Sequence, residues 1–283
     1  MAERKRNGMA ARLCAARGFV IDMDGTLVLG DRHNRGLKPL PGAVDFLAHL
    51  QAKKIPFVLF TNGTVRPPRD YVGKLADAGL AVTEDQIMTP SSVAAEYLKA
   101  KGFSRVMAMG GEGVAAPLAE IGLEIASPRD AKNIDAIFIG WFREFAMEDI
   151  EAACEAVWGG AKVFAASLVP YFATADGRTL GTSCAIAGAI EKITGARARV
   201  LGKPAPEALA MARKRLGVAA RDLAVIGDDP RLEIPMARRA GALAIGVTSG
   251  VSKEADYAAE PKARRAHMVA PNIGAVLDSW RRS

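Results

Sequence analysis

The sequence of 283 residues has no apolar run that approaches the roughly 20 residues needed to cross a bilayer. Its first residues, MAERKRNGMAARLCAARG, also lack the apolar block of about 7 to 15 residues found in a secretory signal. Half of the residues are hydrophobic, which is enough for a substantial core. We therefore expect a folded cytoplasmic protein with no membrane partner.

Cysteine is scarce, and its spacing carries no metal or disulfide signal. The three cysteines, Cys14, Cys154 and Cys184, lie far apart and form no CxxC pair. This pattern argues against a disulfide framework and against a zinc site. We expect buried thiols without a chemical role.

Aromatic residues do not alternate with the basic residues in the basic segments. The net charge is +7, and residues 1–17 contain five Lys or Arg against the single acid Glu3. Further basic clusters, PKARRAH and WRRS, have no aromatic residues interleaved with the basic ones to act as base-stacking platforms. The charge therefore predicts a solvated basic surface that attracts anionic small molecules, and no nucleic-acid partner.

Short apolar runs alternate with helical patterns along the chain, which predicts an α/β fold around a parallel sheet of the Rossmann-like kind. Many of the helical segments end in glycine, as helix C-termini often do. The expected strands are GFVID, IPFVLFTNG, RVMAMGG, DAIFIG, KVFAAS, LAVIGDD and ALAIGVTSG.

Polar groups follow only some of these strands. VIDMD, LFTNG, VIGDD and GVTSG end in polar residues, whereas the middle strands end mainly in small ones. In an open parallel sheet, ligands bind outside the carboxyl ends of the strands. We therefore expect a core built from both ends of the chain and an inserted α/β domain. The expected division is a basic tail over 1–17, core over 18–89, insertion over 90–197 and core over 198–283.

The polar strand ends together have the chemistry of a phosphate site. Carboxylates surrounded by oxygen ligands suit Mg²⁺. A lysine and a hydroxyl beside backbone N–H groups suit a phosphate. The residues concerned are Asp22, Asp24, Thr61, Asn62, Lys203, Asp228 and Asp229.

The order of these motifs, DxDGT, TNG, GKP and then GD, resembles the haloacid dehalogenase superfamily of phosphohydrolases. The stretch FVLFTNG, an insertion of about 100 residues before GKPAPE, and ITGARARVLGKP narrow the likeness to the p-nitrophenylphosphatase and sugar-phosphatase subfamily, which has a large α/β cap. The resemblance covers nearly everything from Phe19 onward. It implies a Mg²⁺-dependent phosphatase of small phosphomonoesters such as a sugar phosphate, a nucleotide monophosphate or p-nitrophenyl phosphate.

The resemblance also implies a role for each matching residue. Asp22 would attack phosphorus to form an aspartyl-phosphate, and Asp24 would act as general acid and then base. Lys203 would hold the nucleophile and the phosphate. The carboxylates of Asp22 and Asp228, with the backbone carbonyl of Asp24, would bind Mg²⁺. The phosphoryl oxygens would be bound by Thr61 and the amides of Asn62 and Gly63.

One position departs from the family pattern. Family members commonly have an aspartate five residues after the GD aspartate, where this chain has Glu233. Either Glu233 or Asp229 is expected to support the metal. In the insertion, Arg178 is expected to pair with an anionic leaving group, or to be an exposed turn residue.

Two other functions and one partner stay open from the sequence. A non-catalytic phosphate-binding or regulatory protein on the same scaffold would fit the Glu233 departure, although it has no need of a general acid at Asp24. Gly111, Gly113 and Ala116 form a GxGxxA pattern typical of dinucleotide binding, but no strand closes on a carboxylate about 20 residues later, which favours a tight turn. A homodimer through the cap is a further expectation, with DAIFIGWF as one segment that could form it.

Overall fold

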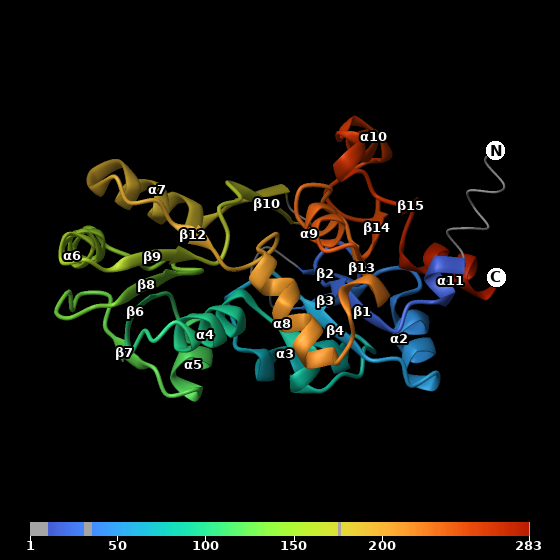
Figure 1. Cartoon of the computed structure of the whole chain (residues 1–283), viewed down its shortest axis with the longest axis horizontal. Helices are drawn as coiled ribbons and strands as arrows, with labels where there is room; N and C mark the ends of the chain where they lie inside the picture. Colours follow the sequence, from blue (N-terminus) through green and yellow to red (C-terminus); the bar gives the residue numbers. More distant parts are fainter. Residues whose placement is uncertain (1–10, 31–35, 175–176, 283) are drawn as a thin grey trace.

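The computed structural model describes residues 11–30, 36–174 and 177–282. Two parallel sheets lie side by side in it, each with helices on both faces (Figure 1). The first sheet takes its strands from both ends of the chain, and the second takes them from the middle. This arrangement confirms the predicted α/β fold. We propose that the second sheet and its helices form the inserted domain; its boundaries near residues 90 and 197 stay a prediction.

The first sheet has six parallel strands in the order β15-β14-β13-β1-β4-β5. Its central strand is β1, which pairs with β13 on one side and with β4 on the other. The strands are β1 (Gly18–Asp22), β4 (Phe57–Phe60), β5 (Ile87–Met88), β13 (Leu223–Gly227), β14 (Leu243–Val247) and β15 (Met268–Ala270).

Helices cover both faces of this sheet, so both faces are buried. Alternate residues of each strand point to opposite faces. Phe19 and Ile21 pack with helices α2 and α11 on one face, whereas Val20 packs with α8 and α9 on the other. The helices around this sheet are α2 (Ala43–Ala52), α3 (Pro68–Asp77), α8 (Pro206–Leu216), α9 (Glu233–Arg239), α10 (Glu254–Ala259) and α11 (Ile273–Arg281). Short 3₁₀ turns are η1 (Glu84–Gln86), η2 (Ala220–Asp222) and η3 (Lys262–Arg264).

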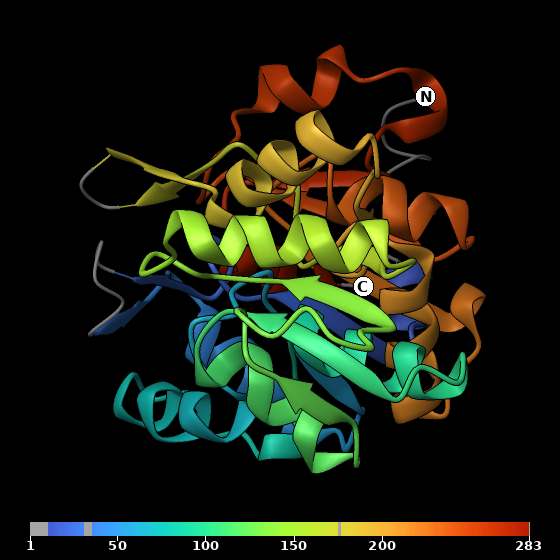
Figure 2. The same cartoon turned by 90° about the vertical axis from the view of Figure 1, so that its left-hand side faces the viewer.

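The second sheet has five parallel strands in the order β12-β9-β8-β6-β7. They are β6 (Arg105–Met109), β7 (Glu124–Ala126), β8 (Ala136–Ile139), β9 (Lys162–Ala165) and β12 (Arg199–Val200). Helices α6 (Met147–Trp158) and α7 (Thr182–Thr194) cover the face toward the viewer in Figure 2, and α4 (Pro90–Ala100) and α5 (Glu112–Glu120) cover the other. Every residue of β8 is buried, and Trp141 and Phe142 after it are half-buried, so a dimer through DAIFIGWF stays a prediction.

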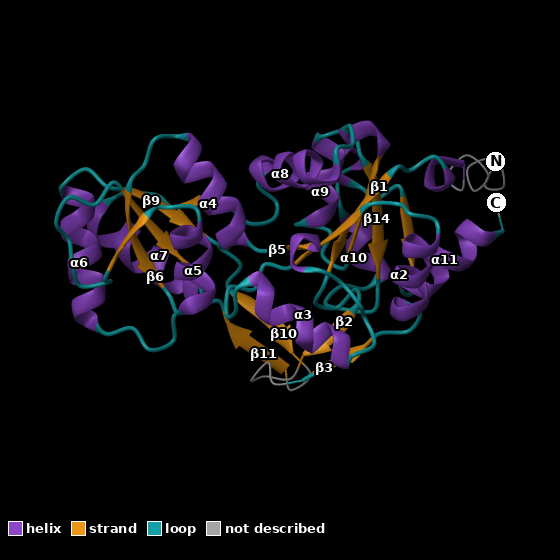
Figure 3. Ribbon diagram, turned by 90° about the horizontal axis from the view of Figure 1, so that it is seen from below, coloured by secondary structure: helices purple, strands orange, loops and turns teal. Residues whose placement is uncertain are grey.

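Two antiparallel hairpins project from the same side of the molecule (Figures 2 and 3). One pairs β2 (Val28–Gly30) with β3 (Leu37–Pro39), and the other pairs β10 (Tyr171–Thr174) with β11 (Gly177–Leu180). Arg178 lies in β11 opposite Ala173, but its side chain is outside the described part of the structure. Its expected contact with a leaving group therefore stays a prediction.

One hydrophobic cluster joins the two sheets. Val20 of the first sheet and Phe138 of the second belong to it, and α4 packs against α8 at the junction. At the N-terminus, Leu13 is buried against the first sheet's other core, so the segment expected to be a tail is packed from there onward. Over the described ranges, no helix is long and apolar enough to span a membrane.

Candidate active site

The polar strand ends predicted from the sequence meet at the carboxyl edge of the first sheet. Asp22 is the last residue of β1, Thr61 follows β4, and Asp228 follows β13. Because β13, β1 and β4 are neighbours in the sheet, these three side chains lie at one edge. Asp22, Thr61 and Asp228 are all nearly buried.

Lys203, in the loop between β12 and α8, reaches into this edge with only 3% of its surface exposed. Its ammonium forms an ion pair with Oδ1 of Asp22 and lies 2.8 Å from Oε1 of Glu233. It also donates to the carbonyl of Phe60 over 2.9 Å. Burial alone would lower the pKa of Lys203, but the two carboxylates together raise it above its ordinary value. The lysine is therefore a fixed positive charge beside Asp22.

The side chain of Asn62 fixes the backbone of Lys203. Its Nδ2 donates to the Lys203 carbonyl over 3.1 Å, and its Oδ1 accepts from the Lys203 amide over 2.8 Å. These two bonds join residues that are 141 positions apart in the chain. The sequence pointed only to the backbone amide of Asn62, so this role of the side chain was missed.

Asp24 stands at the mouth of the site, next to Thr61. Asp24 is exposed at the surface, but many protein atoms lie around its carboxyl group and partly desolvate it. This desolvation, and then the negative charge of Asp22, raise the pKa of Asp24. The Thr61 hydroxyl donates to Oδ2 of Asp24 over 2.8 Å and accepts from the amide of Gly63 over 2.8 Å. Asp24 is thus a carboxyl group that holds a proton more readily than usual, within reach of solvent.

Asp228 lies in a narrow space lined by glycine. A Cβ added to Gly25 or Gly250 would come within 2.3 or 1.9 Å of its Oδ2. The same oxygen accepts a hydrogen bond from the amide of Val251 over 2.7 Å. Burial and the charges of Asp22 and Glu233 raise the pKa of Asp228 well above its ordinary value.

This donor set fits a magnesium ion. Buried carboxylates that repel one another are stabilised by a cation between them, and oxygen is the ligand that Mg²⁺ prefers. No group of three or more His, Cys, Asp or Glu side chains within the described ranges is arranged to hold a metal. A site here would instead combine the carboxylates of Asp22 and Asp228 with a backbone carbonyl and water.

Comparison with known proteins agrees with this geometry. A family described as haloacid dehalogenase-like hydrolase matches residues 19–124, and a second, HAD-hydrolase-like, matches residues 200–276. Together these matches cover well over half of the chain and contain every predicted site residue except Arg178. The chain belongs to the haloacid dehalogenase superfamily of hydrolases.

Individual members of the superfamily match nearly the whole chain. It is 28% identical over 268 residues to dihydroxyacetone phosphatase of Corynebacterium glutamicum, covering 93% of this chain and 91% of the relative. It is 27% identical over 237 residues to acid sugar phosphatase of Staphylococcus haemolyticus, covering 83% and 86%.

Solved structures of the superfamily superpose equally well. The 4-nitrophenylphosphatase of Thermotoga maritima has a TM-score of 0.85 at 27% identity, covering 95% of this chain and 99% of that one. Glycerol phosphate phosphatase of Mycobacterium tuberculosis, in complex with magnesium, has a TM-score of 0.83 at 26% identity, covering 94% and 77%. These likenesses confirm the predicted superfamily and its p-nitrophenylphosphatase and sugar-phosphatase subfamily.

Asp229 and Glu233, the two other acids expected near the metal, are bound to protein groups in the structure. Both oxygens of Asp229 accept from the guanidinium of Arg231, over 3.0 and 2.9 Å. Glu233 is bound to Lys203 and to the backbone amide of Asp229. The expectation that Asp229 or Glu233 supports the metal therefore gains no support from their contacts.

Of the glycines in the GxGxxA pattern, Gly113 has a structural explanation in this superfamily member. A Cβ on Gly113 would lie 2.4 Å from both the Thr64 carbonyl and the Arg66 amide. Nearby, the amide of Trp141 bonds to the Thr64 hydroxyl over 2.7 Å. Gly113 thus lets α5 approach directly the loop that contains Thr61 and Thr64.

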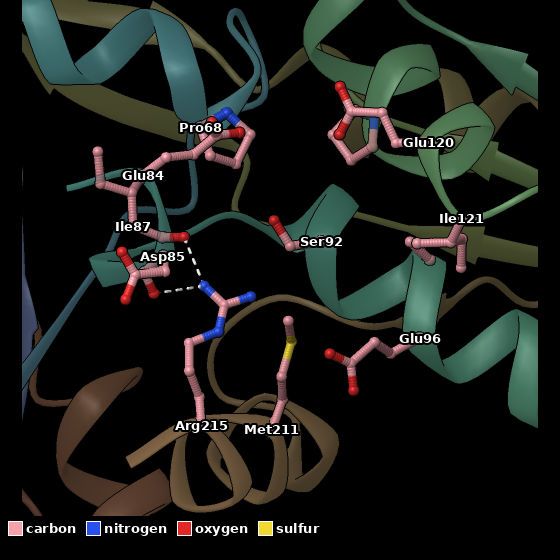
Figure 4. Close-up of a pocket in the computed structure, with 12 residues that line it drawn as sticks. Pro68, Glu84, Asp85, Ile87, Ser92, Glu96, Glu120, Ile121, Met211 and Arg215 are labelled. Carbon is pink, nitrogen blue, oxygen red and sulfur yellow. Dashed lines mark hydrogen bonds between the residues drawn. The ribbon is translucent and has the colours of Figure 1, made fainter.

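A cavity of about 520 Å³ lies elsewhere, between α3, α4, α5 and α8 (Figure 4). Arg215 points into it and donates to the carbonyls of Asp85 and Ile87. None of the predicted site residues lines this cavity. We therefore expect the chemistry at the strand ends, where the predicted site residues lie.

Two further contacts shape the site and were not predicted from the sequence. Thr26 donates to Oδ2 of Asp22 over 2.8 Å, and Ser249 donates to the carbonyl of Gly25 over 2.7 Å. Both hydroxyls stand in motifs that the sequence did display, DGT and TSG. What the sequence could not display is which carboxylate or carbonyl each of them binds.

Proposed function

We propose that this protein is a Mg²⁺-dependent phosphatase that hydrolyses small phosphomonoesters through an aspartyl-phosphate on Asp22. The observation that carries the proposal is the buried ion pair between Asp22 and Lys203, with Asp24 beside it and open to solvent. A nucleophile fixed by a cation and an acid with a raised pKa are the two groups that phosphoryl transfer to a carboxylate needs.

The steps follow from the positions of these groups. A free lone pair of the Asp22 carboxylate attacks phosphorus, and the bond from phosphorus to the leaving oxygen breaks. Asp24 gives its proton to that oxygen as it leaves. Asp24 then accepts a proton from water, whose oxygen attacks phosphorus and releases inorganic phosphate from Asp22. Thr61 and the amides of Asn62 and Gly63 hold the phosphoryl oxygens throughout.

The carboxylates of Asp22 and Asp228 and the carbonyl of Asp24 are the proposed metal ligands. When bound, Mg²⁺ supplies positive charge that offsets the negative charge of the phosphoryl group and the carboxylates. Lys203 supplies a second positive charge beside Asp22. We assign neither Asp229 nor Glu233 to the metal, because their contacts with Arg231 and Lys203 give no observation that favours a metal role for either.

The substrate class rests on the relatives. They are named as phosphatases of sugar phosphates, of dihydroxyacetone phosphate and of 4-nitrophenyl phosphate. We propose that the substrate of this protein is a phosphomonoester of similarly small size. A homodimer through the cap also stays a proposal; Met147 and Trp158 at the two ends of α6 are exposed apolar residues that could contribute to it.

Phosphate release tests this proposal. A panel of phosphomonoesters is incubated at neutral pH with Mg²⁺ or with EDTA, using the wild type and Asp22→Asn. We expect release that needs Mg²⁺ and that disappears in the variant. Full turnover by Asp22→Asn would contradict the mechanism. Binding of phosphate without turnover on any ester would favour the phosphate-binding or regulatory protein instead.

A further inference from the structure

Glu233 occupies the position where the superfamily pattern has a shorter acid, and its carboxylate is fully engaged. Only 1% of the residue is exposed. Its Oε1 lies 2.8 Å from Nζ of Lys203, and its Oε2 accepts from the amide of Asp229 over 3.2 Å. Each oxygen therefore has a defined protein partner.

The Glu233 side chain can follow its path because Gly227 beneath it has no side chain. Gly227 ends β13, and a Cβ placed on it would lie 2.1 Å from Cγ and 2.5 Å from Cδ of Glu233. The Glu233 side chain thus runs directly over the bare backbone of Gly227. This groove carries the carboxylate from the start of α9 to Lys203.

Lys203 has three N–H donors, and the structure provides three acceptors. They are Oδ1 of Asp22, the carbonyl of Phe60 and Oε1 of Glu233. A lysine ammonium whose three donors are all bound is fixed in rotation as well as in position. Removing one acceptor leaves a buried donor unsatisfied and lets the ammonium move away from Asp22.

We propose that Glu233 is a positioning residue that holds the Lys203 ammonium against Asp22, and that it is not a metal ligand. This inference rests on the proposed function, which gives Lys203 its role beside the nucleophile Asp22. Glu233 itself touches neither Asp22 nor the expected place of the phosphoryl group. It acts through Lys203.

Two substitutions separate the positioning role from a metal role. Glu233→Gln keeps one acceptor oxygen at the same reach for Lys203, at the cost of an NH2 group facing the Asp229 amide. Glu233→Asp withdraws both carboxylate oxygens by about 1.5 Å, the length of one C–C bond. A positioning role therefore predicts that Gln preserves more activity than Asp. A metal ligand predicts the reverse, because Asp restores the family pattern and Gln loses the charge.

The measurements are kcat, KM, the Mg²⁺ concentration that gives half-maximal activity, and the affinity for inorganic phosphate by calorimetry. We expect Glu233→Asp to lower kcat by about 10- to 100-fold and to weaken phosphate binding, with a smaller loss in Glu233→Gln. The Mg²⁺ requirement stays at the wild-type value in both. A Glu233→Asp variant as active as the wild type, or a Glu233→Gln variant that needs more Mg²⁺, would overturn the proposal.

Glu191→Asp serves as the matched control. Glu191 lies on α7 and pairs with Arg197 beyond the end of that helix, so shortening its side chain should change none of these values. Thermal unfolding of each variant shows that it is folded. A wild type that releases no phosphate from any ester would count against the proposed function alone. The calorimetric affinities for inorganic phosphate would then still rank Glu233→Gln against Glu233→Asp.

Gly227→Ala tests the groove without changing any charge. The added methyl group displaces the Glu233 side chain, so we expect a loss of kcat similar to that in Glu233→Ala, which removes the side chain. The double variant Gly227→Ala/Glu233→Ala should have no lower kcat than either single variant, because both changes remove the same contact with Lys203. Losses that add would show that the two residues act separately and would overturn the proposal.

Discussion

The hydroxyl of Thr61 donates a hydrogen bond to Oδ2 of Asp24 over 2.8 Å. This bond connects the residue proposed to bind the phosphoryl group with the residue proposed to move protons. It also lowers the pKa of Asp24, against the stronger effects of desolvation and of the Asp22 charge, which raise it. Binding of substrate and acidity of the general acid are thereby coupled through one oxygen atom.

Removing this hydroxyl should shift the pH profile. In Thr61→Val the pKa of Asp24 rises further, so the acid stays protonated to higher pH. Because the proposed first step needs protonated Asp24, the alkaline limb of kcat/KM against pH should move upward. The lost bond to the phosphoryl group should also lower kcat/KM by roughly 10- to 100-fold. Thr61→Ser is the control and should keep the wild-type profile; an unmoved alkaline limb in Thr61→Val would contradict the coupling.

Asn62 allows a separate test of how Lys203 is placed. Asn62→Ala removes both bonds to the Lys203 backbone, and we expect a loss of about 1–3 kcal/mol in the free energy of unfolding, with a fall in kcat. Asn62→Asp keeps the acceptor for the Lys203 amide but loses the donor to its carbonyl. It should therefore fall between the wild type and Asn62→Ala in urea denaturation. Equal stability of all three proteins would show that the two bonds contribute nothing.

The meeting of Lys203 and Asp22 could be predicted from the sequence, but the contacts that support them could not. Asp22, Thr61 and Asp228 follow apolar strands, and the rule that ligands bind at the carboxyl ends of parallel strands brings them together. The bond from Asn62 to Lys203 depends on how two loops 141 residues apart meet, which no local pattern displays.

Glu233 shows the same limit more sharply. Its position in the motif suggested a metal ligand, since an acid is expected there. Its partner is decided by one extra methylene and by the groove over Gly227, both of which act only in three dimensions. The fold itself was predictable because buried strands and helices repeat their patterns locally.

Docking of the two domains at Gly113 should be sensitive to a single methyl group. Gly113→Ala places a Cβ 2.4 Å from the backbone of Thr64 and Arg66, so one of the two domains must shift. Because the Thr64 loop also carries Thr61, we expect kcat/KM to fall by on the order of 100-fold in a protein that remains folded. Gly188→Ala, in α7 with nothing within 4 Å of the new Cβ, is the control and should have wild-type activity. Wild-type kcat/KM in Gly113→Ala would show that the docking contact does not position the site.

His267 should make the protein less stable in mild acid. Its Nδ1 accepts from the Ala244 amide over 2.9 Å, and burial together with the charges of Arg12 and Arg238 lowers its pKa to about 4. Between pH 6.5 and 4 the unfolded chain takes up a proton at this position and the folded chain does not, so stability falls as pH falls through that window.

The comparison with His267→Gln isolates this effect. Glutamine keeps an acceptor for the Ala244 amide but does not titrate, so the variant should lose less stability than the wild type between pH 6.5 and 4. Urea denaturation at several pH values in that window measures the difference. Parallel curves for the two proteins would mean that His267 is protonated in the folded state as easily as in the unfolded one.

The covalent step on Asp22 is the centre of the account, and it can be observed directly. In Asp24→Asn the base that activates water is lost, while p-nitrophenyl phosphate needs little help from an acid to lose its leaving group. The variant is mixed with this ester and Mg²⁺, quenched in acid and digested, and the peptide containing residue 22 is weighed by mass spectrometry. We predict that this peptide gains the mass of one phosphoryl group, and that the gain is absent when Asp22 is also changed to Asn. A burst of nitrophenol with an unmodified peptide would contradict an aspartyl-phosphate on Asp22.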